Sequence, residues 1–484
     1  MKQMNKVILI TYADSMGNNL KDLHQVLNKY FADAIGGIHI LPFFPSSADR
    51  GFAPMCYDRV DEKLGSMADL DAMKEDYPLM FDFMINHISR SSLYFQDFLE
   101  KKDMSEYKNF FIRYKDFWEN GGPTQEQVDL IYKRKPRVPC IDAVFADQTT
   151  EKIWCTFDEE QVDLNIEAKE TRDFIKKTLI DMCRQGASFI RLDAFAYAVK
   201  KPDTNCFFIE PDVWDLLFEA QETVKPFGAD ILPEIHEHYT IQMKLAEKGF
   251  WVYDFALPML VLHALYTGES KNLIHWLDIC PRKQFTTLDT HDGIGVVDVI
   301  GLLSDEEIEL TKELLFEKGA NVKKKYNTAA YNNLDIYQLN CTYYSALGNN
   351  DHAYLLARAI QFFAPGVPQV YYVGLMVGEN DIELMEKTKQ GRDINRHYYS
   401  VGEIDSDMKH MVNQKLVQLM RFRNSCDAFE GDCVTEQTGD NEMCITRSTG
   451  TSQAVLRANL LTHAFSITCQ SPSITGVILT SEDF

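Results

Sequence analysis

The sequence has little positive charge for its size. It carries 49 lysines and arginines against 72 aspartates and glutamates, so the formal net charge of its 484 residues is −23. This balance argues against nucleic acid or an anionic membrane surface as a general partner, and it favours a soluble protein. Any anionic ligand would have to be held by a local cluster of basic residues.

The sequence also lacks long apolar runs near its amino terminus. In MKQMNKVILITYADS only the short run VILI precedes Thr11 and Tyr12, which is too short for a signal peptide or a membrane span. The eleven cysteines are scattered, odd in number and without a CxxC pair, so a reducing compartment is the simpler expectation. Low-complexity segments and short repeats are absent as well. We therefore expect a cytoplasmic protein.

What the sequence does have is an apolar run that ends in polar residues, repeated eight times. Such a run comes after a segment with helical periodicity, and Gly or Pro separates the two, as in LKDLHQVLNKYFADAIGGIHILPFF. The predicted strands are Val7–Tyr12, Ile38–Pro42, Leu79–Ile85, Ser188–Leu192, Ile231–Glu234, Trp251–Phe255, Phe285–Asp289 and Gln369–Val373. Eight parallel strands alternating with helices predict an α/β protein, a closed (β/α)8 TIM barrel, whose active site lies at the carboxyl ends of the strands.

Two connections between predicted strands are too long for a single crossover helix. The first contains turn signals and β-like pieces (ENGGPTQ, EKIWCTF), and the second contains the helical run SDEEIELTKELLFEKG. Short alternating runs near the end, such as CITRSTG and FSITCQ, predict a small antiparallel β domain. The expected division is a barrel from 1–86, 168–292 and 350–430, inserted domains at 87–167 and 293–349 over the active site, and a C-terminal β domain at 431–484.

Three acids stand at the ends of predicted strands. They are Asp193, Glu234 and Asp292. Cleavage of an acetal needs one carboxyl group that protonates the leaving oxygen and a second that attacks the anomeric carbon, and a third can stabilise the cationic transition state. Arg191 would keep the Asp193 carboxylate ionised. A single Asp after a strand would more often cap the next helix, but three on one rim favour catalysis.

Four short motifs carry a resemblance to a known group of enzymes. INH at 85–87, RLDAFAYAVK at 191–200, PEIHEHY at 233–239 and LDTHDGIG at 288–295 resemble the four motifs of the α-amylase clan of glycoside hydrolases. The longer phrases YDFALPM, NNLDIYQLNCTYYSALG, PGVPQVYYVG and GRDINRHYY resemble, more closely, the sucrose phosphorylase family within glycoside hydrolase family 13. The resemblance spans nearly the whole chain and is weakest in the β tail.

The resemblance implies a reaction and roles for single residues. Sucrose and phosphate would give α-D-glucose 1-phosphate and D-fructose with retention, through a β-glucosyl-enzyme. Asp193 would be the nucleophile, Glu234 the acid and base, and Asp292 the transition-state stabiliser. The other residues implied to bind the glucose unit or support its binding are Asp49, Phe52, His87, Arg191, Tyr197, His236, His291 and Arg392.

The resemblance also implies a phosphate site and a mobile acceptor loop. The densest basic cluster is IYKRKPRVP, with Lys133, Arg134, Lys135 and Arg137. The resemblance implies Arg134 as a phosphate contact, and Arg137 from this cluster and Tyr337 from NNLDIYQLN are the other expected phosphate contacts. Without the resemblance, such a short cluster would as readily be a solvated charge run. Leu334, Asp335 and Gln338, from NNLDIYQLN, would bind the fructosyl side, in a loop that exchanges its arrangement between the two acceptors.

Alternatives remain open at this point. Arg137 beside Arg134 could hold a fructosyl phosphate, which would make sucrose 6′-phosphate the substrate, whereas Asp335 would repel such a group. A hydrolase of the same clan would use water instead, and a non-enzymatic barrel is a third and weaker hypothesis, because such relatives lack the acids and carry a membrane span.

We expect no metal and no cofactor, with inorganic phosphate as a co-substrate. His236 and His238 form an HxH pair that a zinc site could use, but no third ligand is evident in the sequence and the family uses none. The expected partners are small molecules, with no nucleic acid and no membrane. The sequence leaves open whether the chain is a monomer or a homodimer.

Overall fold

The eight predicted strands form one parallel sheet. The computed structural model describes residues 5–135, 137–321 and 338–483. The sheet strands are β1 (Ile8–Thr11), β2 (Gly37–Ile40), β3 (Leu79–Met84), β8 (Ala187–Asp193), β9 (Asp230–Pro233), β10 (Val252–Asp254), β11 (Gln284–Thr286) and β14 (Val367–Tyr371). Their order is β10-β11-β14-β1-β2-β3-β8-β9. This order, with helices between the strands, is that of a (β/α)8 barrel, and it confirms the predicted fold class.

The described residues divide into two compact units. The first unit comprises residues up to His39 and those from His236 onward, and the second extends from Ile40 to Ile235. β1, β10, β11 and β14 belong to the first unit, where β1 pairs with β14 and β11 pairs with both β10 and β14. β3, β8 and β9 belong to the second unit, where β8 pairs with both neighbours in parallel.

The helices follow from amphipathic patterns with polar caps. In the second unit they are α2 (Met67–Asp76), α3 (Leu93–Lys101), α4 (Tyr114–Phe117), α5 (Gln125–Leu130), α6 (Lys169–Arg184) and α7 (Asp212–Val224). In the first unit they are α1 (Leu20–Tyr30), α8 (Thr240–Glu247), α9 (Leu257–Thr267), α10 (Lys271–Ile279), α11 (Asp305–Glu317), α12 (Tyr343–Ala346), α13 (Asp351–Phe363), α14 (Tyr372–Leu375), α15 (Ile382–Thr388), α16 (Val401–Asp407) and α17 (Met411–Ser425). No helix in the described ranges combines the length and the apolar character needed to cross a membrane.

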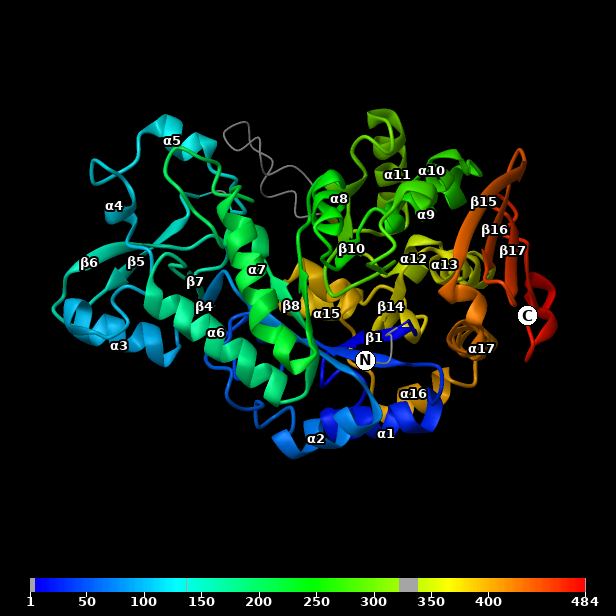
Figure 1. The fold of residues 1–484 in the computed structure, drawn as a ribbon, viewed down its shortest axis with the longest axis horizontal. Coiled ribbons are helices and arrows are strands. Elements are labelled where there is room, and N and C mark those ends of the chain that lie inside the picture. Colours follow the sequence, from blue (N-terminus) through cyan, green and yellow to red (C-terminus); the bar gives the residue numbers. More distant parts are fainter. Residues whose placement is uncertain (1–4, 136, 322–337, 484) are drawn as a thin grey trace. The chain divides into compact units, whose positions relative to one another are not determined.

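Residues between β3 and α6 form a small α/β subdomain of the second unit. Two antiparallel pairs organise it: β4 (His87–Ser89) with β7 (Gln161–Asp163), and β5 (Cys140–Val144) with β6 (Thr150–Trp154). Its apolar core is largely aromatic and includes Phe95, Phe98, Phe110, Phe111 and Phe145. Figure 1 shows these strands beside α3, α4 and α5. The domain boundaries given above stay predictions.

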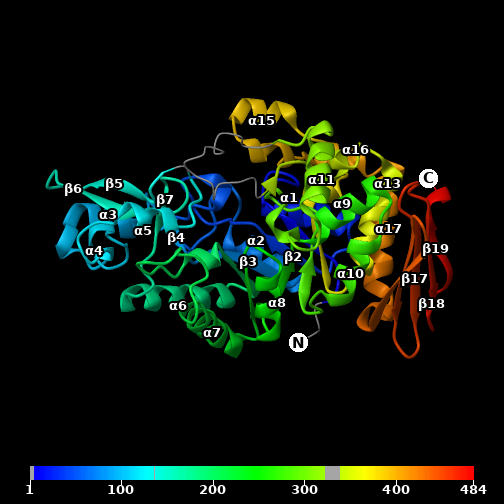
Figure 2. The same cartoon turned by 90° about the horizontal axis from the view of Figure 1, so that it is seen from above.

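The chain ends in an antiparallel sheet, as the alternating runs predict. Its strands are β15 (Asp432–Gly439), β16 (Glu442–Ser448), β17 (Gln453–Asn459), β18 (Phe465–Gln470) and β19 (Thr475–Thr480), paired in sequence order. Figures 1 and 2 show this sheet beside α17, and α17 contacts β19.

Two buried arginines, one from this sheet and one from α17, bind the carboxyl end of α13. Arg447 on β16 donates hydrogen bonds to the carbonyls of Phe363, Ala364, Phe429 and Gly431. Arg423 on α17 donates to the carbonyls of Phe362, Gly366 and Asn5 and to the side chain of Asn5. Both guanidinium groups therefore satisfy the carbonyls at the carboxyl end of α13, where the helix dipole favours positive charge.

Candidate active site

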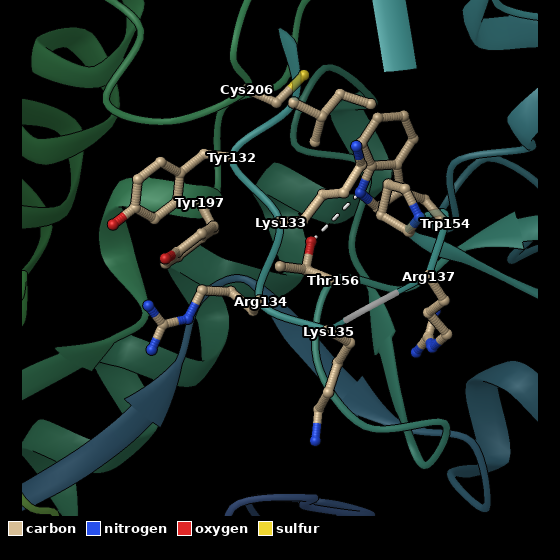
Figure 3. Close-up of a pocket in the computed structure, with 11 residues that line it drawn as sticks. Tyr132, Lys133, Arg134, Lys135, Arg137, Trp154, Thr156, Tyr197 and Cys206 are labelled. Carbon is tan, nitrogen blue, oxygen red and sulfur yellow. Dashed lines mark hydrogen bonds between the residues drawn. The ribbon is translucent and has the colours of Figure 1, made fainter. Parts of the chain in front are cut away.

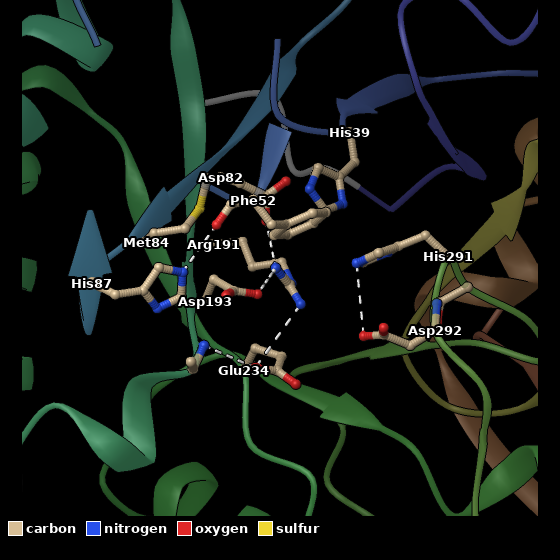
Figure 4. A network of polar contacts seen from close by, with 12 residues as sticks. His39, Phe52, Asp82, Met84, His87, Arg191, Asp193, Glu234, His291 and Asp292 are labelled. Carbon is tan, nitrogen blue, oxygen red and sulfur yellow. Dashed lines mark hydrogen bonds and ion pairs between the residues drawn. The ribbon is translucent and has the colours of Figure 1, made fainter. Parts of the chain in front are cut away.

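In the second unit, the end of β8 is organised around Arg191. The Arg191 guanidinium lies 2.5 Å from the buried Asp82 carboxylate on β3 and 2.8 Å from the Asp193 carboxylate, and its other nitrogen lies 4.0 Å from Glu234. Figure 4 shows Asp193 and Glu234 beside this side chain. Because β3 and β8 are parallel and in register from Asp82 to Arg191, the strands themselves bring these groups together. A guanidinium so placed favours the ionised form of a neighbouring carboxyl group.

Glu234 follows β9 and is oriented by the backbone of the neighbouring strand end. The Ala194 N–H donates a 3.0 Å hydrogen bond to Glu234 Oε2. Ala194 has φ of 52°, a left-handed conformation that a non-glycine residue adopts only at an energetic cost. The residue after Asp193 thus has an unfavourable backbone conformation, and its N–H donates to the carboxyl group of Glu234.

Other predicted substrate residues of the second unit lie near this strand end. His87 is buried, its Nε2 is 3.0 Å from the Phe52 carbonyl, and burial lowers the pKa of its ring. The Phe52 ring lies 6.0 Å from the Arg191 guanidinium carbon. Asp49 begins a tight turn in which Asp49 and Arg50 both have positive φ, and a Cβ on Gly51 would meet the Pro42 carbonyl at 2.4 Å. Only glycine fits that position.

In the first unit, Asp292 lies in a strongly positive environment. Its carboxylate is 3.2 Å from Arg392 and 3.7 Å from the His291 ring. Burial alone would raise its pKa, but Arg392, His291 and His236 together hold the pKa of this carboxyl group well below its usual range. Asp292 is therefore ionised throughout the physiological pH range, as electrostatic stabilisation of a cation requires.

The loop that carries His291 and Asp292 is fixed by two residues that the sequence analysis did not single out. Asn395 donates hydrogen bonds to the carbonyls of Thr290 and Asp292, and Arg396 donates to the carbonyl of His291. Both belong to the phrase GRDINRHYY, from which only Arg392 was predicted. The resemblance of this phrase to the family could have indicated both residues. Their hydrogen-bond partners could not be predicted, because the bonded carbonyls lie about a hundred residues earlier in the chain.

His236 is placed by two contacts within the first unit. Its ring stacks on Phe255 with a centroid separation of 3.8 Å, and its Nδ1 is 3.4 Å from Asp298 Oδ2. Asp298 is buried, and a Cβ on Gly295 would meet its Oδ2 at 2.1 Å, so Gly295 leaves the space that Asp298 occupies. Asp298, in the short 3-10 helix Val297–Val299, was not predicted, since its position in the sequence gives no signal of its partner.

The second histidine of the HxH pair has different contacts. His238 Nδ1 lies 3.0 Å from Thr240 Oγ1, and the ring stacks on Tyr239. The two rings thus have separate partners.

In the second unit, the basic cluster separates into side chains with different contacts (Figure 3). Arg134 extends over the Tyr197 ring, with 5.9 Å between the guanidinium carbon and the ring centroid. Lys133 is buried, which lowers its pKa, and Lys135 is 3.8 Å from Asp158. Tyr197 also packs against Tyr132 and Phe207.

The predicted phosphate contact by Arg137 is not supported. Its guanidinium donates hydrogen bonds to the carbonyls of Val138, Cys140, Cys155 and Phe157, which ties the strands β5 and β6 and their flanking loops together. Figure 3 shows Arg134 and Arg137 extending in different directions. A guanidinium occupied by four carbonyls has a structural role, and the sequence spacing could not reveal it.

Three predicted acceptor residues, Leu334, Asp335 and Tyr337, lie outside the described residues. Gln338 begins β13 (Gln338–Leu339), which pairs with β12 (Ile294–Gly295) two residues after Asp292. Of the residues predicted to bind the fructosyl unit, Gln338 is therefore the only one among the described residues.

Comparisons with known proteins identify the family of this chain. The family model "Alpha amylase, catalytic domain" matches residues 10–247. The chain is 56% identical to a sucrose phosphorylase of Streptococcus mutans, covering 91% of this chain and 92% of that one. It is 42% identical to a sucrose 6(F)-phosphate phosphorylase of Thermoanaerobacterium thermosaccharolyticum, covering 96% of each. A crystal structure of sucrose 6F-phosphate phosphorylase from Thermoanaerobacter thermosaccharolyticum superposes with a TM-score of 0.94 at 41% identity, over 99% of this chain and 98% of that one.

Proposed function

Because this chain belongs to the sucrose phosphorylase family within the α-amylase family, we propose that it converts sucrose and phosphate to α-D-glucose 1-phosphate and D-fructose. The chain is a glycosyl-transferring phosphorylase. The observation that carries the assignment of roles is the Arg191 network, in which one guanidinium lies beside both Asp193 and Glu234.

In the first step, Asp193 attacks the anomeric carbon of the glucosyl unit. Arg191 keeps this carboxylate ionised and fixes its orientation. Glu234 protonates the glycosidic oxygen, so fructose leaves with that proton and a β-glucosyl ester forms on Asp193. The ionised Asp292 stabilises the positive charge that develops on the sugar ring in the transition state.

In the second step, phosphate attacks the same carbon and releases Asp193. Glu234, now ionised, accepts the proton of the attacking phosphate. Two inversions give overall retention, hence the α anomer of glucose 1-phosphate. Arg134 supplies the positive charge that phosphate requires, because a guanidinium can bind a phosphate through two parallel hydrogen bonds. Both steps need only proton transfer and a carboxylate nucleophile, so we propose that the reaction uses no metal and no cofactor besides the phosphate co-substrate.

The choice between sucrose and sucrose 6′-phosphate depends on the cations of the acceptor side. A phosphorylated fructosyl unit would need a cation besides the one that binds inorganic phosphate. Arg137, the candidate for that role, is engaged by backbone carbonyls. This favours unmodified sucrose, and it agrees with the higher identity to a sucrose phosphorylase than to a sucrose 6(F)-phosphate phosphorylase. We place the reaction in the cytoplasm.

Product analysis tests the proposal. The purified protein is incubated with sucrose or with sucrose 6′-phosphate, each with and without inorganic phosphate, and glucose 1-phosphate and glucose are quantified. We expect glucose 1-phosphate mainly from sucrose. Preferential use of the phosphorylated sugar would reverse the substrate assignment, and glucose released at a rate indifferent to phosphate would identify a hydrolase.

Arg134→Ala tests the phosphate contact. The variant should reduce phosphorolysis at least about tenfold, as expected for the loss of a charge-assisted hydrogen bond, while hydrolysis of sucrose without phosphate changes much less. Lys135→Ala, which removes a neighbouring charge near Asp158, is the matched control and should leave both rates near those of the wild type. Equal losses of phosphorolysis and hydrolysis in Arg134→Ala would contradict the assignment.

A further inference from the structure

A second cluster of titratable groups lies in the first unit, between helices α9, α10 and α11. His263 belongs to α9, Glu269 follows the end of that helix, and Glu307 lies in the first turn of α11. Figures 1 and 2 both place α11 beside α9, and the two helices are in contact. None of these three residues has a part in the reaction proposed above.

The contacts of His263 determine which of its ring nitrogens carries hydrogen. Its Nδ1 lies 3.0 Å from Thr311 Oγ1. The Thr311 hydroxyl donates its one hydrogen to the Glu307 carbonyl at 2.7 Å, as serine and threonine hydroxyls commonly do within a helix. The hydroxyl oxygen is then left to accept, so Nδ1 carries the hydrogen and Nε2 presents its lone pair.

The Nε2 atom of His263 is buried and has no hydrogen-bond partner among the described residues. The atom that it faces is Glu307 Oε1, at 3.6 Å. This is too long for an N–H···O hydrogen bond. It is close to the separation of roughly 3.4 Å between two ligands of a tetrahedral zinc ion with bonds of about 2.1 Å.

A third ligand atom lies at the same place. The candidate atoms of His263, Glu269 and Glu307 all lie within 4.8 Å of one another. Gly268, with φ of 80°, ends α9 in a left-handed turn, and Thr267 Oγ1 accepts a hydrogen bond from the Glu269 N–H. This turn reverses the chain direction, so Glu269 lies near His263 in the preceding helix α9.

The carboxylate of Glu307 is held in place from outside the cluster. Its Oε2 accepts a hydrogen bond from the Ser304 backbone at 2.7 Å, as part of the capping box of α11, and its Oε1 accepts one from the Asn272 side chain at 2.9 Å. Such outer partners orient a metal ligand and are a regular feature of metal sites.

We propose that His263, Glu269 and Glu307 bind one zinc-type divalent cation. One imidazole nitrogen and two carboxylates are a donor set suited to zinc, and water would complete the tetrahedron. Glu269 is exposed, so the ion and its water enter from solvent on that side. The ion would connect the turn between α9 and α10 to the first turn of α11, and its role is structural.

Metal titration of the intact protein tests this site. The chain is stripped with EDTA, transferred to phosphate-free buffer and titrated with zinc chloride in a calorimeter. We expect one zinc per chain at this site. The melting temperature should rise by about 3 °C when free zinc exceeds its dissociation constant a hundredfold. The magnesium ion prefers oxygen ligands to imidazole, so magnesium chloride should neither bind at this site nor raise the melting temperature.

Substitutions test whether zinc binds at these three residues. Glu269→Gln changes an exposed side chain and should weaken zinc binding at least tenfold without affecting the fold, and His263→Gln should abolish it. His275→Gln and Glu306→Gln, exposed positions on the same two neighbouring helices α10 and α11, are the matched controls and should bind as the wild type does. The proposal is overturned if the wild type takes up no zinc, or if Glu269→Gln binds zinc as tightly as the controls do.

Discussion

At the scale of single residues, the assignment rests most heavily on Asp193. Asp193→Ala removes the nucleophile and should lower turnover by at least about 10⁴-fold, while thermal unfolding stays close to that of the wild type because the side chain is not part of the apolar core. Steady-state phosphorolysis of sucrose measures the effect. Asp215→Ala, at an exposed position on α7, is the control. Substantial residual turnover in Asp193→Ala would refute the covalent mechanism.

The strained residue after the nucleophile gives a second prediction. Ala194→Gly relieves the left-handed conformation and keeps the N–H that Glu234 accepts, so activity should stay within about threefold of the wild type. Ala194→Val adds a β-branched side chain at positive φ, which costs about 1–3 kcal/mol of strain. We expect this variant to have a lower free energy of unfolding and a lower kcat. Melting temperatures and kcat values of the two variants would show this. Equal behaviour of Gly and Val would disprove the link between backbone strain and the position of Glu234.

Asp298 should act on catalysis through His236. Asp298→Asn preserves the volume but replaces the carboxylate beside Nδ1, so we expect kcat/KM for sucrose to fall about tenfold, the loss of one hydrogen bond to a charged group. Asp305→Asn, an exposed acid nearby, should have no such effect. If Asp298→Asn acts only through the fold, its loss of activity will parallel a loss of melting temperature. In that case His236→Ala will also lower kcat/KM by the same factor in the wild type and in the Asp298→Asn variant.

At the residue scale, the sequence indicated the contact between Asp193 and Arg191 at a strand end, but it did not indicate the residues that hold such side chains in place. Asp193 and Arg191 are neighbours in the chain, so their contact follows from the strand. Asp82 reaches the same guanidinium from another strand, and Asn395 binds carbonyls about a hundred residues away. For Arg137, a charge in a basic run gave no sign of the four carbonyls that its guanidinium contacts.

At the scale of elements, the joint between the terminal sheet and α13 depends on Arg447. Arg447→Met keeps an apolar stem but removes a charged donor from four carbonyls, of which that of Phe429 keeps a bond from the Asn5 side chain, so the free energy of unfolding should fall by at least about 3 kcal/mol. Urea unfolding measures this. Arg457→Met, on the exposed side of the adjacent strand β17, is the matched control and should change stability by less than about 0.5 kcal/mol. Similar values for the two variants would show that the carbonyls find other donors.

The sequence predicted every strand of the barrel but not every length. β10 and β11 are three residues each, although the apolar runs Trp251–Phe255 and Phe285–Asp289 predicted five. Apolar residues at both strand ends continue into loops that are themselves buried, as Leu288 and Phe255 are. Hydrophobicity reports burial, and in a buried parallel sheet it does not mark the residue where hydrogen bonding ends.

At the scale of the whole molecule, stability should depend on pH through Asp254. Burial raises the pKa of this carboxyl group to about 7, although Trp276 and the Leu257 N–H donate to it. The folded chain therefore binds the proton more tightly than the unfolded chain, whose pKa is about 3.9. This contribution stabilises the fold at low pH and is lost as the pH rises toward 7.

Asp254→Asn isolates this effect from that of the other carboxyl groups. Between pH 5 and pH 7.5 the wild type should lose about 2.5 kcal/mol of unfolding free energy relative to the variant. Urea unfolding at the two pH values measures the difference. Parallel pH dependence of the two proteins would mean that Asp254 is ionised throughout, held by its hydrogen-bond donors.

The pairing of β1 with β14 has a consequence for how the chain is made. Ile8 pairs with Gln369, about 360 residues further along the chain. At roughly 5–20 residues per second, a ribosome needs about 20–70 s to deliver the second strand after the first. Throughout that interval one edge of the apolar segment ILIT is open to other chains. Slower translation would lengthen the exposure, so the yield of active protein should respond to synthesis rate and to chaperones that cover the nascent amino terminus.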